Sequence, residues 1–134
     1  MKLLSLNPGD TIGIFSPSRG ITGEAPEATK RAVAFLEQNG YRVKLGNLTG
    51  KQDFYRSGSI ADRAEEFNAL LHDDSVNCLM ASIGGYVSNS ILPYIDYAFF
   101  RRIPKSSWGC PMLLRFYWGF MQKREFPPFM VRIL

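Results

Sequence analysis

The sequence has few of the residues that build metal centres and disulfide frameworks. Its 134 residues include two cysteines, Cys78 and Cys110, and one histidine, His72. Two cysteines form neither a disulfide framework nor a metal-binding cluster, so we expect no metal and no cofactor. His72 lies near the end of an expected helix, where a hydrogen-bond donor suits the exposed carbonyls. This structural role is preferred to a catalytic one.

Long apolar runs are also missing. No stretch reaches the roughly 18 apolar residues that a membrane-spanning helix needs. Ser5, Asn7 and Pro8 interrupt the N-terminal segment before a hydrophobic region develops, unlike in a signal peptide. We therefore expect a cytoplasmic protein without a membrane partner.

The sequence also contains neither a G-x-G-x-x-G sequence nor a P-loop, the glycine motifs of nucleotide-binding sites.

The excess of basic residues is confined to the C-terminal part of the chain. Residues 1–103 carry 11 basic and 11 acidic residues, whereas residues 104–134 carry five basic residues and one acidic residue. The second segment also holds both tryptophans and four of the eight prolines. A basic, aromatic segment can bind nucleic acid. We expect no nucleic-acid partner, because a change of reading frame, described below, explains the shift in composition.

Short apolar runs alternate with amphipathic stretches along the first 100 residues. They predict strands near residues 11–15, 41–45 and 76–82, a helix over 27–39 and a second helix that starts after Ser59. Ser59 and Asp62 have the spacing of a capping box. The alternation implies right-handed crossovers and an α/β fold, with a parallel sheet and flanking helices.

Each expected helix has one apolar face, and that of the second helix is expected to be a buried stripe. In the first helix this face consists of Ala28, Ala32, Phe35 and Leu36, and in the second of Ile60, Ala64, Phe67 and Leu71. The charged residues Arg63, Glu65 and Glu66 of the second helix are expected to face water.

The stretch 76–90 is the strongest candidate for a functional site. It begins as an apolar run and breaks at Gly84 and Gly85, which is typical of a buried strand that enters a loop at its carboxyl end. Ligands of open α/β sheets bind at that end, and glycines let the backbone approach them closely. Side chains of residues 88–90 could cap the next helix. A plain strand-to-helix turn remains the alternative.

Four segments resemble motifs of the LD-carboxypeptidase family of serine peptidases, in the form of its microcin C immunity branch. They are PGDTIGI at residues 8–14 with SPS at 16–18, DFYRSGS at 53–59 with Arg63, SIGGY at 82–86 with SNS at 88–90, and LPYIDY at 92–97. Val87 departs from that branch, where asparagine is expected. The resemblance covers residues 2–105.

The resemblance implies an N-terminal α/β domain of flavodoxin-like or Rossmann-like type, followed by a C-terminal domain, in a homodimer. It also implies a Ser-Glu-His triad that cleaves murein peptides or peptide-nucleotide antibiotics. The implied oxyanion and substrate loop comprises Gly84, Gly85, Tyr86, Asn89 and Ser90. A second substrate-side loop comprises Ser16, Pro17 and Ser18.

The resemblance ends at Lys105. A Gly-x-Ser-Asp nucleophile elbow should follow, but Pro111 stands where the serine belongs and Met112 where the aspartate belongs. The Glu and His of the triad have no counterpart, so no catalytic residue is expected in this chain. A one-nucleotide shift near Lys105, with synonymous codons chosen freely, permits a reading that contains Gly-x-Ser-Asp. We therefore predict an N-terminal domain of residues 1–105 and a frameshifted tail of residues 106–134.

Such a tail should cover the sheet poorly. We expect it to be the least ordered part of the chain, with Trp108, Trp118 and Phe120 exposed and the edge of the third strand unpaired. Two functions remain open: an inactive piece of a serine carboxypeptidase, or a non-catalytic module that binds a carboxylate or phosphate ligand at the Gly84–Gly85 loop.

Overall fold

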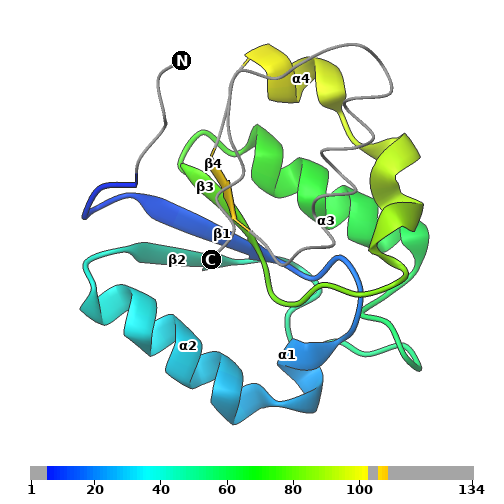
Figure 1. The fold of residues 1–134 in the computed structure, drawn as a ribbon, viewed down its shortest axis with the longest axis horizontal. Helices are drawn as coiled ribbons and strands as arrows, with labels where there is room; N and C mark the ends of the chain where they lie inside the picture. The colour runs from blue at the N-terminus through cyan, green and yellow to red at the C-terminus, as the bar shows by residue number, and fades with distance from the viewer. Residues whose placement is uncertain (1–5, 103–105, 109–134) are drawn as a thin grey trace.

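The computed structural model describes residues 6–102 and 106–108 and contains a four-stranded parallel sheet (Figure 1). The strands are β1 (Thr11–Phe15), β2 (Arg42–Leu45), β3 (Cys78–Ala81) and β4 (Ser106–Trp108), in the order β2-β1-β3-β4. The predicted α/β fold is confirmed, and the three predicted strands begin and end within two residues of the observed ones.

Helices cover the sheet from both sides (Figure 1). They are α1 (Ile21–Glu24), α2 (Pro26–Gln38), α3 (Ile60–His72), the 3₁₀ helix η1 (Ser88–Tyr94) and α4 (Tyr97–Arg102). Leu36 of α2 packs with β1 residues Ile12 and Ile14, whereas α3 packs on the opposite face against Phe15 and Leu79. Right-handed crossovers produce this placement, because the chain moves from β1 to one side of the sheet and then back past β1.

The larger of the two core clusters lies between the sheet, α3, η1 and α4. Phe15 and Phe67 meet edge to face with ring centroids 5.0 Å apart, an arrangement that aromatic pairs favour. Ala64, Phe67 and Leu71 are buried as predicted, but Ile60, at the start of α3, is 38% exposed. The apolar period of α3 therefore decides how the helix faces the sheet from its second turn onward.

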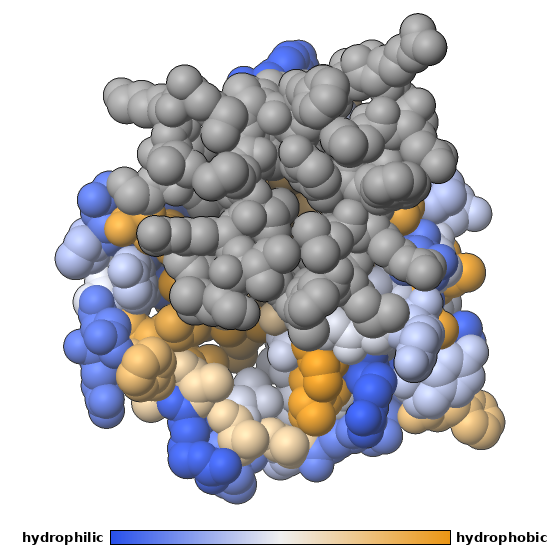
Figure 2. All heavy atoms as spheres, viewed as in Figure 1, coloured by the Kyte–Doolittle hydropathy of each residue, from blue (hydrophilic) through white to orange (hydrophobic). Residues whose placement is uncertain are grey.

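The predicted apolar face of α2 is present but is not buried. No residue of α2 is buried; Ala28 and Ala32 are exposed, and Phe35 is 64% exposed. The face turns toward the sheet, where Leu36 packs, but beside this contact a groove of about 400 Å³ lies between α2 and the sheet and reaches Met80 of β3. Apolar surface lies among hydrophilic side chains on the α2 side of the molecule (Figure 2). Periodicity fixed the direction of the face but not how closely it packs.

The edge of β3 is paired, contrary to our prediction. Residues 78–80 of β3 align in parallel register with residues 106–108 of β4. Parallel pairing needs only backbone N–H and C=O groups, so a strand formed where the sequence offers no apolar run. The rest of the predicted tail, from residue 109 onward, lies outside the described residues. Within the described part of the chain, no helix is long and apolar enough to cross a membrane.

The capping box at the start of α3 is confirmed. Ser59 Oγ accepts a hydrogen bond from the Asp62 amide at 3.1 Å, and Asp62 Oδ2 accepts one from the Ser59 amide at 3.1 Å. The Ser59 hydroxyl also donates to the Asp62 carboxylate and lowers the pKa of Asp62. This reciprocal pair ends the preceding loop and begins the helix that carries the site residues described below.

We predict that Ser59→Ala lowers the free energy of unfolding by about 1 kcal/mol, because amides of the first turn lose their acceptor. Urea unfolding followed by circular dichroism measures this change. Ser59→Thr keeps the hydroxyl and is the control. An unchanged urea midpoint in Ser59→Ala would show that the box does not stabilise α3.

Candidate functional site

The candidate site lies where β1 and β3 end side by side at the carboxyl edge of the sheet. The Ser82 amide donates to the Phe15 carbonyl at 2.8 Å, and the hydroxyls of Ser82 and Ser16 are 3.3 Å apart. Beyond this point the chain enters the loop 16–18 on one strand and the loop 82–90 on the other. The two loops that the sequence predicted as parts of one site are therefore neighbours.

Gly85 is required by close packing between these loops. A Cβ atom at this position would lie 1.9 Å from Ser18 Oγ and 2.7 Å from Ser18 Cβ. Both are shorter than any ordinary contact, so an alanine would have to displace one of the loops. Gly46, in the loop after β2, is restricted in the same way, because its Cβ would lie 2.1 Å from Glu66 Oε1.

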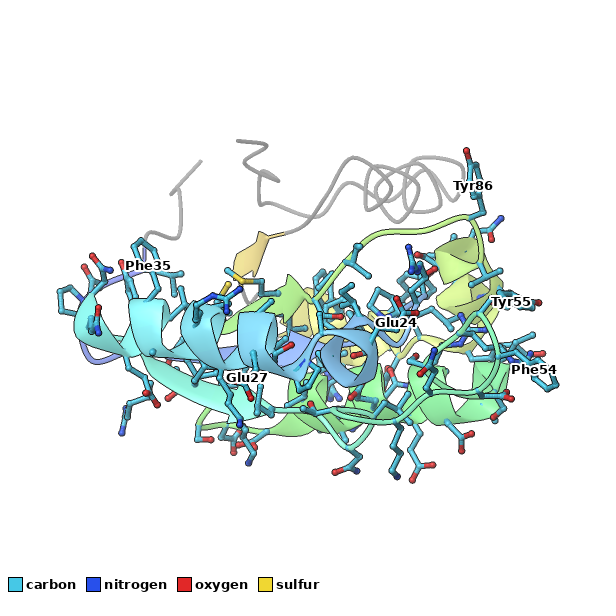
Figure 3. All side chains as sticks on the ribbon, turned by 90° about the horizontal axis from the view of Figure 1, so that it is seen from below. Glu24, Glu27, Phe35, Phe54, Tyr55 and Tyr86 are labelled. Atoms are coloured by element: carbon cyan, nitrogen blue, oxygen red, sulfur yellow. The ribbon has the colours of Figure 1, made fainter. Side chains whose placement is uncertain are left out.

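The outer surface of the site consists of the predicted substrate loop. Tyr86 is 92% exposed and Asn89 is exposed, whereas Gly84, Gly85 and Ser90 are partly buried. Tyr86 projects from the same end of the molecule as Phe54 and Tyr55 (Figure 3). The hydroxyls of Ser88 and Ser90 donate to the carbonyls of Gly85 and Val87 instead of capping η1. The predicted capping role is wrong, because the turn itself already uses these hydroxyls.

Ser16, Pro17 and Ser18 are buried beneath that surface. The Ser57 hydroxyl donates to the Ser16 carbonyl at 2.6 Å, and the Ser57 amide donates to the Ser18 carbonyl at 2.8 Å. The structure shows these residues as the support of the Gly84–Gly85 loop. Their direct contact with a substrate stays a prediction.

Arg63 lies under the site, and its predicted exposure to water is wrong. The side chain is 1% exposed. Its guanidinium donates to the carbonyls of Pro17 at 2.7 Å and Val87 at 3.0 Å and to Ser90 Oγ at 3.1 Å. Burial lowers the pKa of Arg63, although arginine keeps its charge under ordinary conditions. The polar groups of the loops replace the water that this charge loses.

Glu66 lies one turn further along α3, and its predicted exposure to water is also wrong. The residue is only 2% exposed. Its carboxylate accepts the amides of Ser16 at 2.7 Å and Leu48 at 2.8 Å. Burial raises the pKa of Glu66, and the two amide hydrogen bonds oppose this shift. Arg63 and Glu66 form no ion pair with each other or with any other described side chain. Each charge is held by peptide groups or a hydroxyl.

A helical spacing in the sequence could have revealed both buried charges. Arg63 lies four residues before Phe67 and seven before Leu70, and Glu66 lies four before Leu70. Residues with these spacings share a face of a helix, and Phe67 and Leu70 are buried. The predicted apolar stripe of α3 was therefore too narrow and left both charges outside it.

The remaining candidate residues lie away from this centre. His72 Nε2 is 3.0 Å from Asp96 Oδ2, and its ring packs edge to face on Phe99. This pair links the end of α3 to the start of α4, and the role predicted for His72 beside the helix carbonyls stays a prediction. Pro111, the expected nucleophile position, lies outside the described residues. Over the ranges that the structure describes, no three His, Cys, Asp or Glu side chains are grouped to hold a metal ion.

The fold and the site define an open parallel α/β domain with a glycine loop at the carboxyl edge of its sheet. Residues 12–111 match the sequence profile of the LD-carboxypeptidase N-terminal domain. The chain belongs to the LD-carboxypeptidase family. The match extends six residues beyond Lys105 and includes β4.

Relatives with curated names agree with this assignment. A Vibrio cholerae protein named as a carboxypeptidase is 54% identical over 101 residues, which are 75% of this chain and 30% of that protein. The microcin C7 self-immunity protein MccF of Escherichia coli is 51% identical over 89 residues, covering 66% of this chain and 26% of MccF. The chain thus spans about a third or less of the length of these relatives.

Solved structures show the same fold. MccF in complex with aspartyl sulfamoyl adenosine superposes with a TM-score of 0.84 at 40% identity, over 91% of this chain and 37% of that chain. MccF in complex with glutamyl sulfamoyl guanosine gives a TM-score of 0.77 at 46% identity, over 80% of this chain and 32% of the other. The described domain therefore corresponds to one part of a larger protein of known fold.

We predict that Gly85→Ala destabilises the chain by about 1–3 kcal/mol, because the added methyl group overlaps Ser18. The double variant Gly85→Ala/Ser18→Gly should recover most of this loss, since it removes the overlapping atoms. Urea unfolding of both single variants and the double variant measures the coupling. Additive changes would mean that the two loops do not pack as the structure shows.

A second prediction concerns the pH dependence of stability. Because the pKa of Glu66 in the folded protein is raised above its ordinary value of 4.5, the folded chain holds this proton more tightly than the unfolded chain. The contribution of Glu66 to stability is fully present below that value and is lost as the pH rises through the raised pKa.

Glu66→Gln cannot titrate and, like the protonated carboxyl group, has one carbonyl oxygen as acceptor, so at low pH its unfolding free energy should be within about 1 kcal/mol of that of wild type. As the pH rises through the raised pKa, wild type should lose stability relative to Glu66→Gln. Urea unfolding at a series of pH values checks this. A constant difference would mean that Glu66 has the same pKa in the folded and unfolded chains.

Proposed function

We propose that this chain is the N-terminal, substrate-loop portion of a cytoplasmic serine carboxypeptidase of the LD-carboxypeptidase type and that it does not hydrolyse peptides by itself. The observation that carries the proposal is the supported Gly84–Gly85 loop at the carboxyl edge of a sheet whose sequence belongs to this family. The chain spans about a third of the length of these relatives.

The chemistry of acyl transfer explains why such a loop would be needed. Attack on an amide carbonyl generates a negatively charged oxygen, which is stabilised by donors already in place. Backbone N–H groups of a glycine loop can approach that oxygen because no Cβ atom blocks them. In the proposed function the loop 84–86 supplies such donors, and Tyr86, Asn89 and Ser90 border the substrate.

The nucleophile is the missing component. The position where the family resemblance expects a serine holds Pro111, whose side chain carries no hydroxyl. Removing a catalytic triad leaves only the contribution of binding and of the oxyanion donors. In this proposal residues 106–134 derive from a shifted reading frame near Lys105, and the complete protein acts on murein peptides or peptide-nucleotide antibiotics.

A non-catalytic binding module is the second candidate. The specific observation in its favour is that the loop is packed and supported by residues of this chain alone, in particular Ser18 and Arg63. A preformed turn of backbone N–H groups can hold a carboxylate or phosphate without a nucleophile. The two candidates differ in what the missing part of the relatives contributes.

We predict that the purified chain does not hydrolyse peptides or esters and does not react with a serine-directed fluorophosphonate. The reason is the absence of a hydroxyl at position 111. Mass spectrometry after incubation with the probe measures labelling, and full-length MccF is the positive control. Labelling of any serine far faster than that of free serine would overturn the proposal of an inactive chain.

Ligand binding separates the two candidates. Aspartyl sulfamoyl adenosine, the ligand in the MccF complex, is titrated into the chain by calorimetry. Saturable binding with a shift in melting temperature supports a self-sufficient module, whereas no binding supports a portion that needs the rest of the family's fold.

Sequencing the gene tests the frameshift. The frameshift is excluded if a one-base insertion near codon 105 gives no in-frame Gly-x-Ser-Asp.

A further inference from the structure

We infer that Arg63 is a positioning residue that couples the Gly84–Gly85 loop to segments 16–18 and 57–59, so that the three segments hold one common geometry. The inference rests on the proposed function only in identifying the loop as the substrate loop. The coupling itself follows from the contacts of this chain.

The guanidinium of Arg63 contacts three segments that are distant in the sequence. Its Nε donates to the Gly58 and Ser59 carbonyls at 3.0 and 3.2 Å. Its Nη1 donates to the Pro17 and Val87 carbonyls at 2.7 and 3.0 Å. The planar guanidinium group is thus hydrogen-bonded to the loop after β1, to the start of α3 and to the turn after Gly85. Since the five N–H donors of arginine form a rigid fork, movement of one segment strains the bonds to the others.

Because Arg63 is charged, losing its hydrogen bonds to the three segments costs more than losing those of a neutral group. No carboxylate of residues 6–102 lies within ion-pair distance of its guanidinium, so carbonyl oxygens and one hydroxyl provide its polar contacts. A buried charge that loses such partners is strongly destabilised. Opening any one of the three segments would leave the charge with fewer partners, and the closed arrangement is therefore favoured as a whole.

A lysine at position 63 cannot form all the hydrogen bonds that the Arg63 guanidinium makes. Its ammonium group is compact and lacks the planar fork of a guanidinium, so it can meet some of these carbonyls but not all of them at once. A lysine at position 63 would keep the charge, whereas a methionine would keep only similar length and bulk. The two substitutions separate the role of the charge from that of packing.

Two serines of the same turn provide a matched pair. Ser90 Oγ accepts from Arg63 Nη2 at 3.1 Å and donates to the Val87 carbonyl at 2.6 Å. Ser88 Oγ donates to the Gly85 carbonyl at 2.8 Å and is not among the hydrogen-bond partners of Arg63. Each loses one hydroxyl on substitution by alanine, but only Ser90→Ala weakens the contact with Arg63.

The test is amide hydrogen exchange, followed by mass spectrometry, on the whole chain without ligand. In Arg63→Met we expect exchange to accelerate about tenfold or more in peptides covering 16–20, 57–60 and 84–90, with a smaller change in β1 and β3. Arg63→Lys should recover part of the protection in all three segments. Equal acceleration in the strands and in the loops would overturn the inference, because it would assign Arg63 to general stability only.

The serine pair tests whether the coupling passes through Arg63. Ser90→Ala should accelerate exchange in both 84–90 and 57–60, whereas Ser88→Ala should affect 84–90 alone. If both variants change 57–60 equally, the coupling runs through the Ser18–Gly85 contact and the inference is wrong. Should Arg63→Met fail to fold, Arg63→Lys and the serine pair still decide the question.

The hydrogen-exchange experiments are done without ligand. The coupling can therefore fail while the proposed substrate loop stands, and the reverse also holds. Where the wild-type chain binds aspartyl sulfamoyl adenosine, a greater loss of affinity in Arg63→Met than in Arg63→Lys links the positioning role to the loop.

Discussion

Two buried charges on α3 hold the loops at the carboxyl edge of the sheet. The guanidinium of Arg63 is surrounded by carbonyl oxygens and a hydroxyl, and the carboxylate of Glu66 by amide groups. Such charges are tolerated in a protein interior only when hydrogen bonds replace the lost water. The loops supply these bonds in the conformation that the structure shows, so the position of α3 and the shape of the loops depend on each other.

This dependence explains why the outer surface of the site can be open while its base is rigid. Tyr86 and Asn89 face solvent, but the turn beneath them is fixed by contact between Gly85 and Ser18 and by the bonds of Val87 and Ser90 to Arg63. The contacts that hold the turn thus come from residues of this chain itself.

The residues that support the Gly84–Gly85 loop all lie within the family-matched segment. The support of the Gly84–Gly85 loop comes from residues between Ser16 and Ser90, well within the matched segment 12–111. The relatives extend over about three times this length.

The sequence by itself determined the strands β1 to β3, the helices α2 and α3, and the glycine loop, because apolar period, capping residues and paired glycines act over a few neighbouring positions. It did not determine the burial of Arg63 and Glu66, the open groove beside α2 or the pairing of β4. Those features depend on groups that are distant in the chain: Pro17, for instance, lies 46 residues before Arg63. Only the tertiary structure brings a carbonyl from such a distance to a charged side chain, and only then does burial of that charge become favourable.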